Sequence, residues 1–120
     1  MKKNIFIVTD KNSDLALTAT SLELRYWIMP ITSAEKMFSL LWRMTPDLIF
    51  LDFEMSELDG FDVLRKIKED PIWVKIPLVL LTKQEDNAFR AKALKAGALD
   101  VLYKPVIPSV LFDCVMRYAF

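Results

Sequence analysis

Residues 48–60 read LIFLDFEMSELDG, and this stretch decides the fold. Its first four residues form an apolar run that predicts a buried strand, and Asp52 follows at the carboxyl end. In parallel α/β sheets, ligands and chemistry collect at that edge. Three further apolar runs also end in a charged or hydroxyl side chain, at Asp10, Thr82 and Lys104. The stretch therefore predicts a strand that contributes its carboxylate to a cluster.

Short apolar runs alternate with amphipathic stretches along the whole chain. The predicted strands cover 5–8, 27–32, 48–52, 78–81 and 100–103. The predicted helices cover 13 to about 25, a stretch from Ser33 to Thr45-Pro46, a stretch that starts at Asp59-Gly60, 86–96 and about 109–119. Strands of this kind joined by helices predict a parallel sheet covered on both faces, with right-handed crossovers. Pro30 predicts an edge or irregular position for the second strand.

The apolar spacing also predicts which side chains form the core. The second helix is expected to bury Met37, Leu40, Leu41 and Met44, and the last helix Val110, Leu111, Cys114, Val115 and Tyr118. The three tryptophans are expected to pack in the core or at its edge; they are Trp27, Trp42 and Trp73.

Composition narrows the class of protein. The 120 residues suit a single domain spanning 1–120. Sixteen basic and sixteen acidic residues cancel, so we expect no direct nucleic-acid partner. No apolar run is long enough to span a membrane, and a lone Cys114 suits a reducing compartment, which predicts a cytoplasmic location. The absence of His excludes Ser-His and Cys-His nucleophile pairs, and two Gly are too few for a Gly-rich phosphate loop.

The strand-end residues point to phosphoryl chemistry. Asp10 and Asp52 are expected near one another, and like charges that close require either a shared proton or a bound cation. An oxygen-only site open to water suits Mg²⁺. Thr82 adds a hydroxyl donor and Lys104 a compact positive charge. Attack of an Asp oxygen on phosphorus would give an aspartyl phosphate.

In their order along the chain, these motifs resemble the receiver domain of two-component response regulators. The resemblance covers essentially the whole chain and is carried by Val8-Thr9-Asp10, Leu51-Asp52, Met55, Asp59-Gly60, Thr82 and Lys104-Pro105. It implies a flavodoxin-like (βα)5 three-layer sandwich whose five parallel strands lie in the order 2-1-3-4-5.

The resemblance also implies a role for each matching residue. Asp52 is then the phosphoacceptor, and Thr82 and Lys104 contact the phosphoryl group. Mg²⁺ is held by Asp10, by Asp52 and by the main-chain carbonyl of Glu54. A histidine kinase or phosphotransfer protein is the implied partner, and the peptide before the proline of Lys104-Pro105 is expected to be cis.

The sequence departs from the family pattern at four positions. Thr9 stands where receivers carry the first of two adjacent acids, and the loss of an outer-shell partner typically costs roughly 10- to 100-fold in metal affinity. Ser56 replaces a proline, Lys83 replaces a small residue after Thr82, and Val101 occupies the place of the switch aromatic. These departures bear on metal binding and on signal relay.

Two functional hypotheses follow, and neither is a turnover enzyme. In the first, phosphorylation of Asp52 shifts the surface formed by the fourth helix, fifth strand and fifth helix. In the second, the chain is a pseudo-receiver that docks a partner without phosphorylation. A flavin-binding domain and a phosphatase are less favoured.

Other residues receive structural interpretations. Glu54 and Asp59 are expected to be solvated loop residues, and Tyr103 to point away from the active edge. A homodimer through the last helix region is a further expectation, and the residues proposed for it are Leu111, Phe112, Tyr118 and Phe120.

Overall fold

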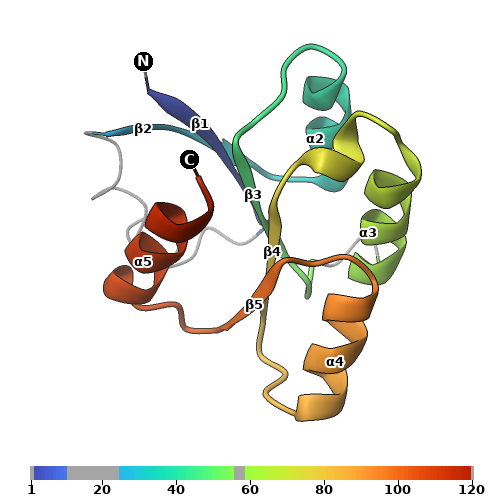
Figure 1. Ribbon diagram of the computed structural model, residues 1–120, viewed down its shortest axis with the longest axis vertical. Helices are drawn as coiled ribbons and strands as arrows, with labels where there is room; N and C mark the ends of the chain where they lie inside the picture. Colours follow the sequence, from blue (N-terminus) through green and yellow to red (C-terminus); the bar gives the residue numbers. More distant parts are fainter. Residues whose placement is uncertain (1, 11–24, 56–58, 120) are drawn as a thin grey trace.

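The central feature of the computed structural model is a five-stranded parallel sheet. The model describes residues 2–10, 25–55 and 59–119. The strands lie in the order β2-β1-β3-β4-β5 (Figure 1). Their bounds are Lys3–Val8 for β1, Tyr26–Ile31 for β2, Leu48–Asp52 for β3, Leu78–Thr82 for β4 and Asp100–Tyr103 for β5. The predicted strand order is confirmed, and Pro30 lies in an edge strand as expected.

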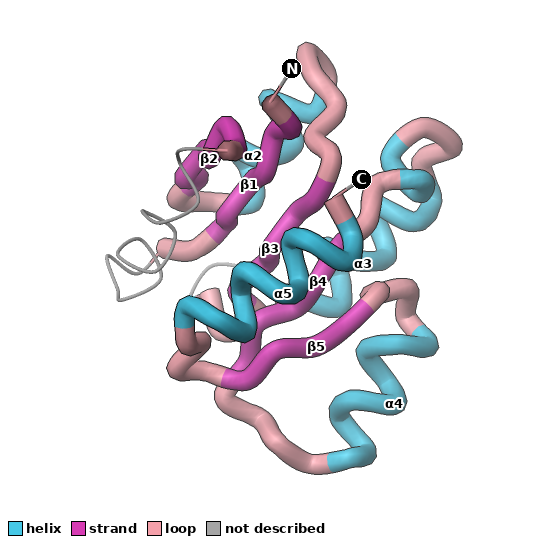
Figure 2. Tube along the Cα trace, turned by 60° about the vertical axis from the view of Figure 1, so that its left-hand side comes forward, coloured by secondary structure: helices cyan, strands magenta, loops and turns pink. Residues whose placement is uncertain are grey.

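Helices cover both faces of this sheet. The helical segments are α2 (Ala34–Leu41), α3 (Gly60–Glu69), the short 3₁₀ segment η1 (Trp73–Lys75), α4 (Asn87–Lys95) and α5 (Pro108–Tyr118). Among them, α2, α3 and α4 lie on one side of the sheet and α5 lies on the other (Figures 1 and 2). The helix expected over 13 to about 25 falls almost entirely outside the described residues. This arrangement is the flavodoxin-like fold.

Local side-chain hydrogen bonds fix where three of the helices begin. Ser33 accepts from the backbone N–H of Lys36 at 3.1 Å, and Asp86 accepts from that of Phe89 at 2.7 Å. Asp59 accepts from Phe61 N–H at 2.8 Å, so this exposed residue caps α3. Each oxygen satisfies an N–H that lacks an intrahelical partner. The helix expected to reach Thr45-Pro46 is shorter, because α2 ends at Leu41.

Alternation along the strands divides the core into two layers. Phe6, Ile49 and Leu80 face α2, α3 and α4, whereas Phe50 and Leu81 face α5. All five side chains are at most 1% exposed. Strands buried on both faces explain the near-continuous apolar runs in the sequence.

The expected core positions are confirmed in part. Leu40 and Met44 are only partly buried, and Val110 is 39% exposed. Trp73 is in the core, but Trp42 follows the end of α2 and is 76% exposed, touching Trp73 edge-on at a centroid distance of 5.1 Å. Helical periodicity fixes the direction of an apolar face, while its width depends on the neighbouring elements.

Candidate functional site

Asp52 is a buried carboxylate at the carboxyl end of the central strand β3. It is 2% exposed, and donors surround both of its oxygens. Oδ2 accepts from the Thr9 hydroxyl at 2.7 Å. Oδ1 accepts from the Glu54 backbone N–H at 3.0 Å and from the ammonium of Lys104. A buried charge is tolerable only when it is paired and hydrogen-bonded in this way.

Lys104 brings a positive charge to the same edge. The residue directly follows β5, and its backbone N–H donates to the Thr82 carbonyl at 2.8 Å. Its ammonium pairs with Asp52 and also with Oε1 of Glu54, at 3.1 Å. The following Lys104–Pro105 peptide is cis, which confirms the expectation.

Thr82, the last residue of β4, is fully buried and directs its hydroxyl to the site. That hydroxyl donates to Oε2 of Glu54 at 2.5 Å and accepts from the Gln84 N–H at 3.0 Å. The next residue, Lys83, is exposed and contributes its backbone N–H, which donates to Oε1 of Glu54 at 2.8 Å. The structure therefore brings Thr82 and Lys104 together around Asp52, as predicted.

The side chain of Glu54 joins the site, although the sequence pattern predicts a role for its main chain alone. It was expected to be solvated, but its side chain is 22% exposed and accepts from Thr82 and Lys83 while pairing with Lys104. The signal available in the sequence was its position two residues beyond Asp52, in a turn that folds back on the strand end. The turn geometry, which the sequence pattern does not reveal, decides that the carboxylate points inward.

Thr9 also changes the hydrogen bonding of Asp52. Val8 and Leu51 are partners in the β1–β3 register, which brings Thr9 beside Asp52. A hydroxyl here donates a hydrogen bond to the Asp52 carboxylate, whereas an ionised acid would accept only. Relative to the receiver pattern that the sequence resembles, Thr9 therefore replaces an acid by a hydroxyl that donates to the Asp52 carboxylate.

The donor chemistry at this edge fits Mg²⁺. Asp10 directly follows Thr9 beyond the end of β1 and is exposed. Within residues 2–10, 25–55 and 59–119, no group of three or more His, Cys, Asp or Glu is arranged to hold a metal. Mg²⁺ usually binds through one or two carboxylates and keeps several waters, so Asp10 and Asp52 supply a suitable oxygen set.

Comparison with known proteins identifies the family. Residues 5–116 match the model of the response regulator receiver domain. The chain belongs to this family. Response regulator PleD of Caulobacter vibrioides is 34% identical over 113 residues, which are 93% of this chain and 25% of PleD. The chain thus spans about a quarter of the length of that relative.

Solved receiver domains share the fold of this one. The signal receiver domain of a histidine kinase from Syntrophus aciditrophicus is 30% identical with a TM-score of 0.84, covering 98% of this chain and 89% of that one. The BeF3-activated receiver domain of DrrB, a Thermotoga maritima protein, is 25% identical with a TM-score of 0.84, covering 98% and 97%. In the described part of this receiver domain, no helix is long and apolar enough to cross a membrane.

Asp100 connects three elements of the receiver domain. Its Oδ1 pairs with Arg90 of α4 at 3.2 Å, and its Oδ2 accepts from the Tyr118 hydroxyl of α5 at 3.0 Å. Burial and this hydrogen bond to Asp100 raise the pKa of Tyr118. Val101 beside it is 3% exposed, and Tyr103 packs against the same core. A polar network therefore joins α4, β5 and α5.

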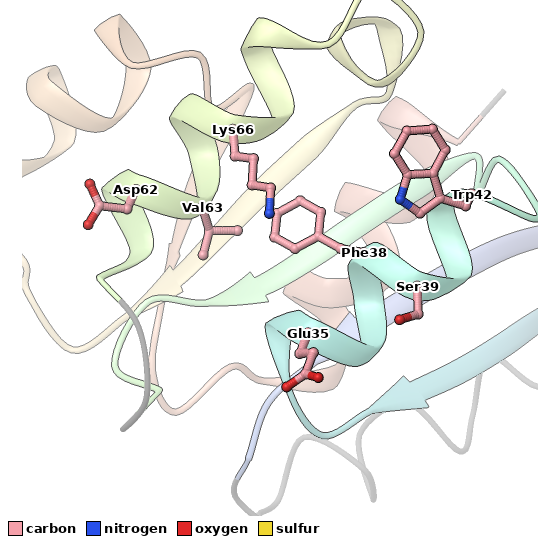
Figure 3. Close-up of a pocket in the computed structure, with 7 residues that line it drawn as sticks. All are labelled: Glu35, Phe38, Ser39, Trp42, Asp62, Val63 and Lys66. Atoms are coloured by element: carbon pink, nitrogen blue, oxygen red, sulfur yellow. The ribbon is translucent and has the colours of Figure 1, made fainter.

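A groove of about 490 Å³ lies between α2 and α3, lined by none of the strand-end residues (Figure 3). Phe38 of α2 and Trp42, which follows that helix, border it on one side, and Asp62 and Lys66 of α3 border it on the other. The Lys66 ammonium lies 4.4 Å from the centre of the Phe38 ring. Cation–π contact of this kind stabilises the packing of the two helices.

The residues expected at a dimer face divide between surface and core. Leu111 is fully buried, so its assignment to a contact face is wrong, and the homodimer stays a prediction. Phe112 is 36% exposed, Tyr118 is partly buried against the core, and Phe120 lies outside the described residues.

Proposed function

We propose that residues 1–120 act as one receiver domain, in the cytoplasm, that accepts a phosphoryl group on Asp52 from a histidine kinase or phosphotransfer protein. The observation that carries the proposal is the buried Asp52 carboxylate, which shares the Lys104 ammonium with Glu54 beside the Thr82 hydroxyl. An oxygen of Asp52 attacks phosphorus and forms a P–O bond. The P–N bond of the donor phosphohistidine breaks, and its electron pair remains on the imidazole nitrogen.

The chain's own residues then stabilise charge on the phosphoryl oxygens. Lys104 supplies a positive charge in a partly water-excluded setting, and Thr82 and the Lys83 N–H supply donors that are already fixed by strand ends. Asp10, Asp52 and the main-chain carbonyl of Glu54 would hold Mg²⁺. Bound there, the ion adds positive charge toward the same oxygens.

The signal would leave through α4, β5 and α5. Thr82 ends β4, and its carbonyl accepts from the N–H of Lys104, which directly follows β5. Asp100 at the start of β5 joins this strand to Arg90 of α4 and Tyr118 of α5. A shift at the end of β5 therefore has a direct route to the outer surface of these elements.

Intact mass spectrometry tests this function. The protein is incubated with Mg²⁺ and either acetyl phosphate or a histidine kinase, and the expected result is a gain of one phosphoryl group. Asp52→Asn should show no gain, because the neutral amide is not a nucleophile of this kind. Absence of the modification with every donor would refute the proposal.

A pseudo-receiver that docks a partner without phosphorylation is the alternative. Two observations favour it: Thr9 occupies the place of a metal-shell acid, and Glu54 already partners the donors. A Mg²⁺ titration followed by NMR separates the two functions. Amide signals of Thr9, Asp52 and Lys83 should move if the domain binds the ion, and unchanged signals would support the pseudo-receiver.

A further inference from the structure

Three donors from two strand ends converge on the carboxylate of Glu54. The Thr82 hydroxyl lies 2.5 Å from Oε2, and the Lys83 N–H and the Lys104 ammonium contact Oε1 at 2.8 and 3.1 Å. Charge-assisted contacts of this kind are roughly twice as strong as neutral hydrogen bonds. Preorganised donors around one anionic group form an oxyanion receptor. In this structure the carboxylate of Glu54 fills that receptor.

The filled receptor lies immediately beside Asp52. The Lys104 ammonium contacts both carboxylates, and the Glu54 N–H donates to Oδ1 of Asp52 at 3.0 Å. A phosphoryl group on Asp52 would bring three strong acceptor oxygens that need donors. Among the described donors at this edge, the Thr82 hydroxyl, the Lys83 N–H and the Lys104 ammonium already contact Glu54, and two anionic groups that share them would repel one another.

We propose that the Glu54 carboxylate occupies the phosphoryl-oxygen subsite of Asp52, so that an incoming phosphoryl group must displace it. The inference rests on the proposed function and assigns Glu54 a role as an intramolecular competitor. When a site is open in only a fraction of the molecules, its apparent affinity for a ligand is reduced by that fraction. Occupancy of the subsite by Glu54 in nine molecules of ten would weaken binding of a phosphoryl analogue about tenfold.

Beryllofluoride, a phosphoryl analogue formed from beryllium and fluoride, tests the competition by binding alone. The full chain is titrated at saturating Mg²⁺ as wild type, Glu54→Gln, Glu54→Ala and the control Glu69→Gln. The control removes one negative charge from an exposed side chain at the end of α3. The readout is the NMR signal of the Lys83 amide, and separate Mg²⁺ titrations correct for any change in cation affinity.

Both Glu54 variants should bind beryllofluoride about tenfold more tightly, while Glu69→Gln stays within twofold of wild type. The Lys83 amide should also move on Glu54→Ala before any ligand is added, because its acceptor is gone. Equal affinity in wild type and both Glu54 variants, or an unmoved Lys83 amide, would overturn the competition and leave the proposed function intact. Absence of binding in all four proteins would overturn both.

Discussion

Replacing Lys104 by methionine should destabilise this domain more than any other single change of a lysine near the site. The ammonium is the cation shared by Asp52 and Glu54, and Asp52 is 2% exposed. Methionine keeps much of the side-chain length but removes the charge, leaving two adjacent carboxylates. Breaking a buried pair by removing one partner typically costs about 3–5 kcal/mol.

The partial exposure of Glu54 places the expected loss in the free energy of unfolding at the lower end of that range. Glu54 is 22% exposed and can recover some water, whereas the Asp52 carboxylate cannot. We therefore expect Lys104→Met to lower the free energy of unfolding by about 3 kcal/mol. Adding Asp52→Asn removes the most buried charge, so the double variant should regain about 2 kcal/mol, within the coupling typical of contacting residues.

Urea denaturation followed by tryptophan fluorescence measures these differences. With a slope near 1.5 kcal/mol per M, the Lys104→Met midpoint should fall by about 2 M. The matched control is Lys83→Met, an exposed lysine beside the same site, which should change stability by less than about 0.5 kcal/mol. A loss below about 1 kcal/mol for Lys104→Met, or strict additivity in the double variant, would show that the shared cation is not what supports the buried carboxylate.

Three further changes test the fold itself. Burial raises the pKa of the Cys114 thiol to about 12 from 9.0. The stability that this shift contributes is present below pH 9.0 and lost as the pH rises through 12, and urea melts across that range should show the decline. The native thiol should also resist Ellman's reagent at neutral pH. Gly97→Ala should cost at least about 1–2 kcal/mol, because φ is 114° and the added Cβ would lie 2.5 Å from Cε of Lys68; an unchanged melting temperature would contradict this. Ile107→Ser should stabilise the domain by about 1 kcal/mol, because the residue before α5 is exposed and offers no side-chain cap; calorimetry that shows no gain would refute it.

The sequence was sufficient to predict the sheet and most of the site. Apolar runs indicate the strands, and a parallel sheet gathers strand ends at one edge, which is where Asp52, Thr82 and Lys104 lie. Pattern arguments work here because Asp52 and Thr82 end their strands and Lys104 directly follows β5, and burial fixes the register of these strands.

The failures have a different physical origin. Glu54 lies in a turn, where the backbone path rather than a repeating period sets the direction of a side chain. The helix expected to reach Thr45-Pro46 ends earlier, at Leu41, which leaves the exposed Trp42 ring in edge-on contact with Trp73. Val110 shows the same limit, since periodicity gives the centre of a buried face and not its edges.

Two features of the site, the hydroxyl of Thr9 and the carboxylate of Glu54, act in the same direction. Receivers resembling this one carry an acid where Thr9 stands, on the side where a cation would bind. Here that side has a hydroxyl donating to Asp52, and the negative charge of Glu54 lies instead among the donors that phosphoryl oxygens would need. Less negative charge where Mg²⁺ would bind weakens the attraction for this ion, and a negative charge among the donors opposes entry of a phosphoryl group. Under the proposed function both effects favour the unphosphorylated state, so intact mass spectrometry should show more phosphorylation of Thr9→Asp combined with Glu54→Gln than of either single variant.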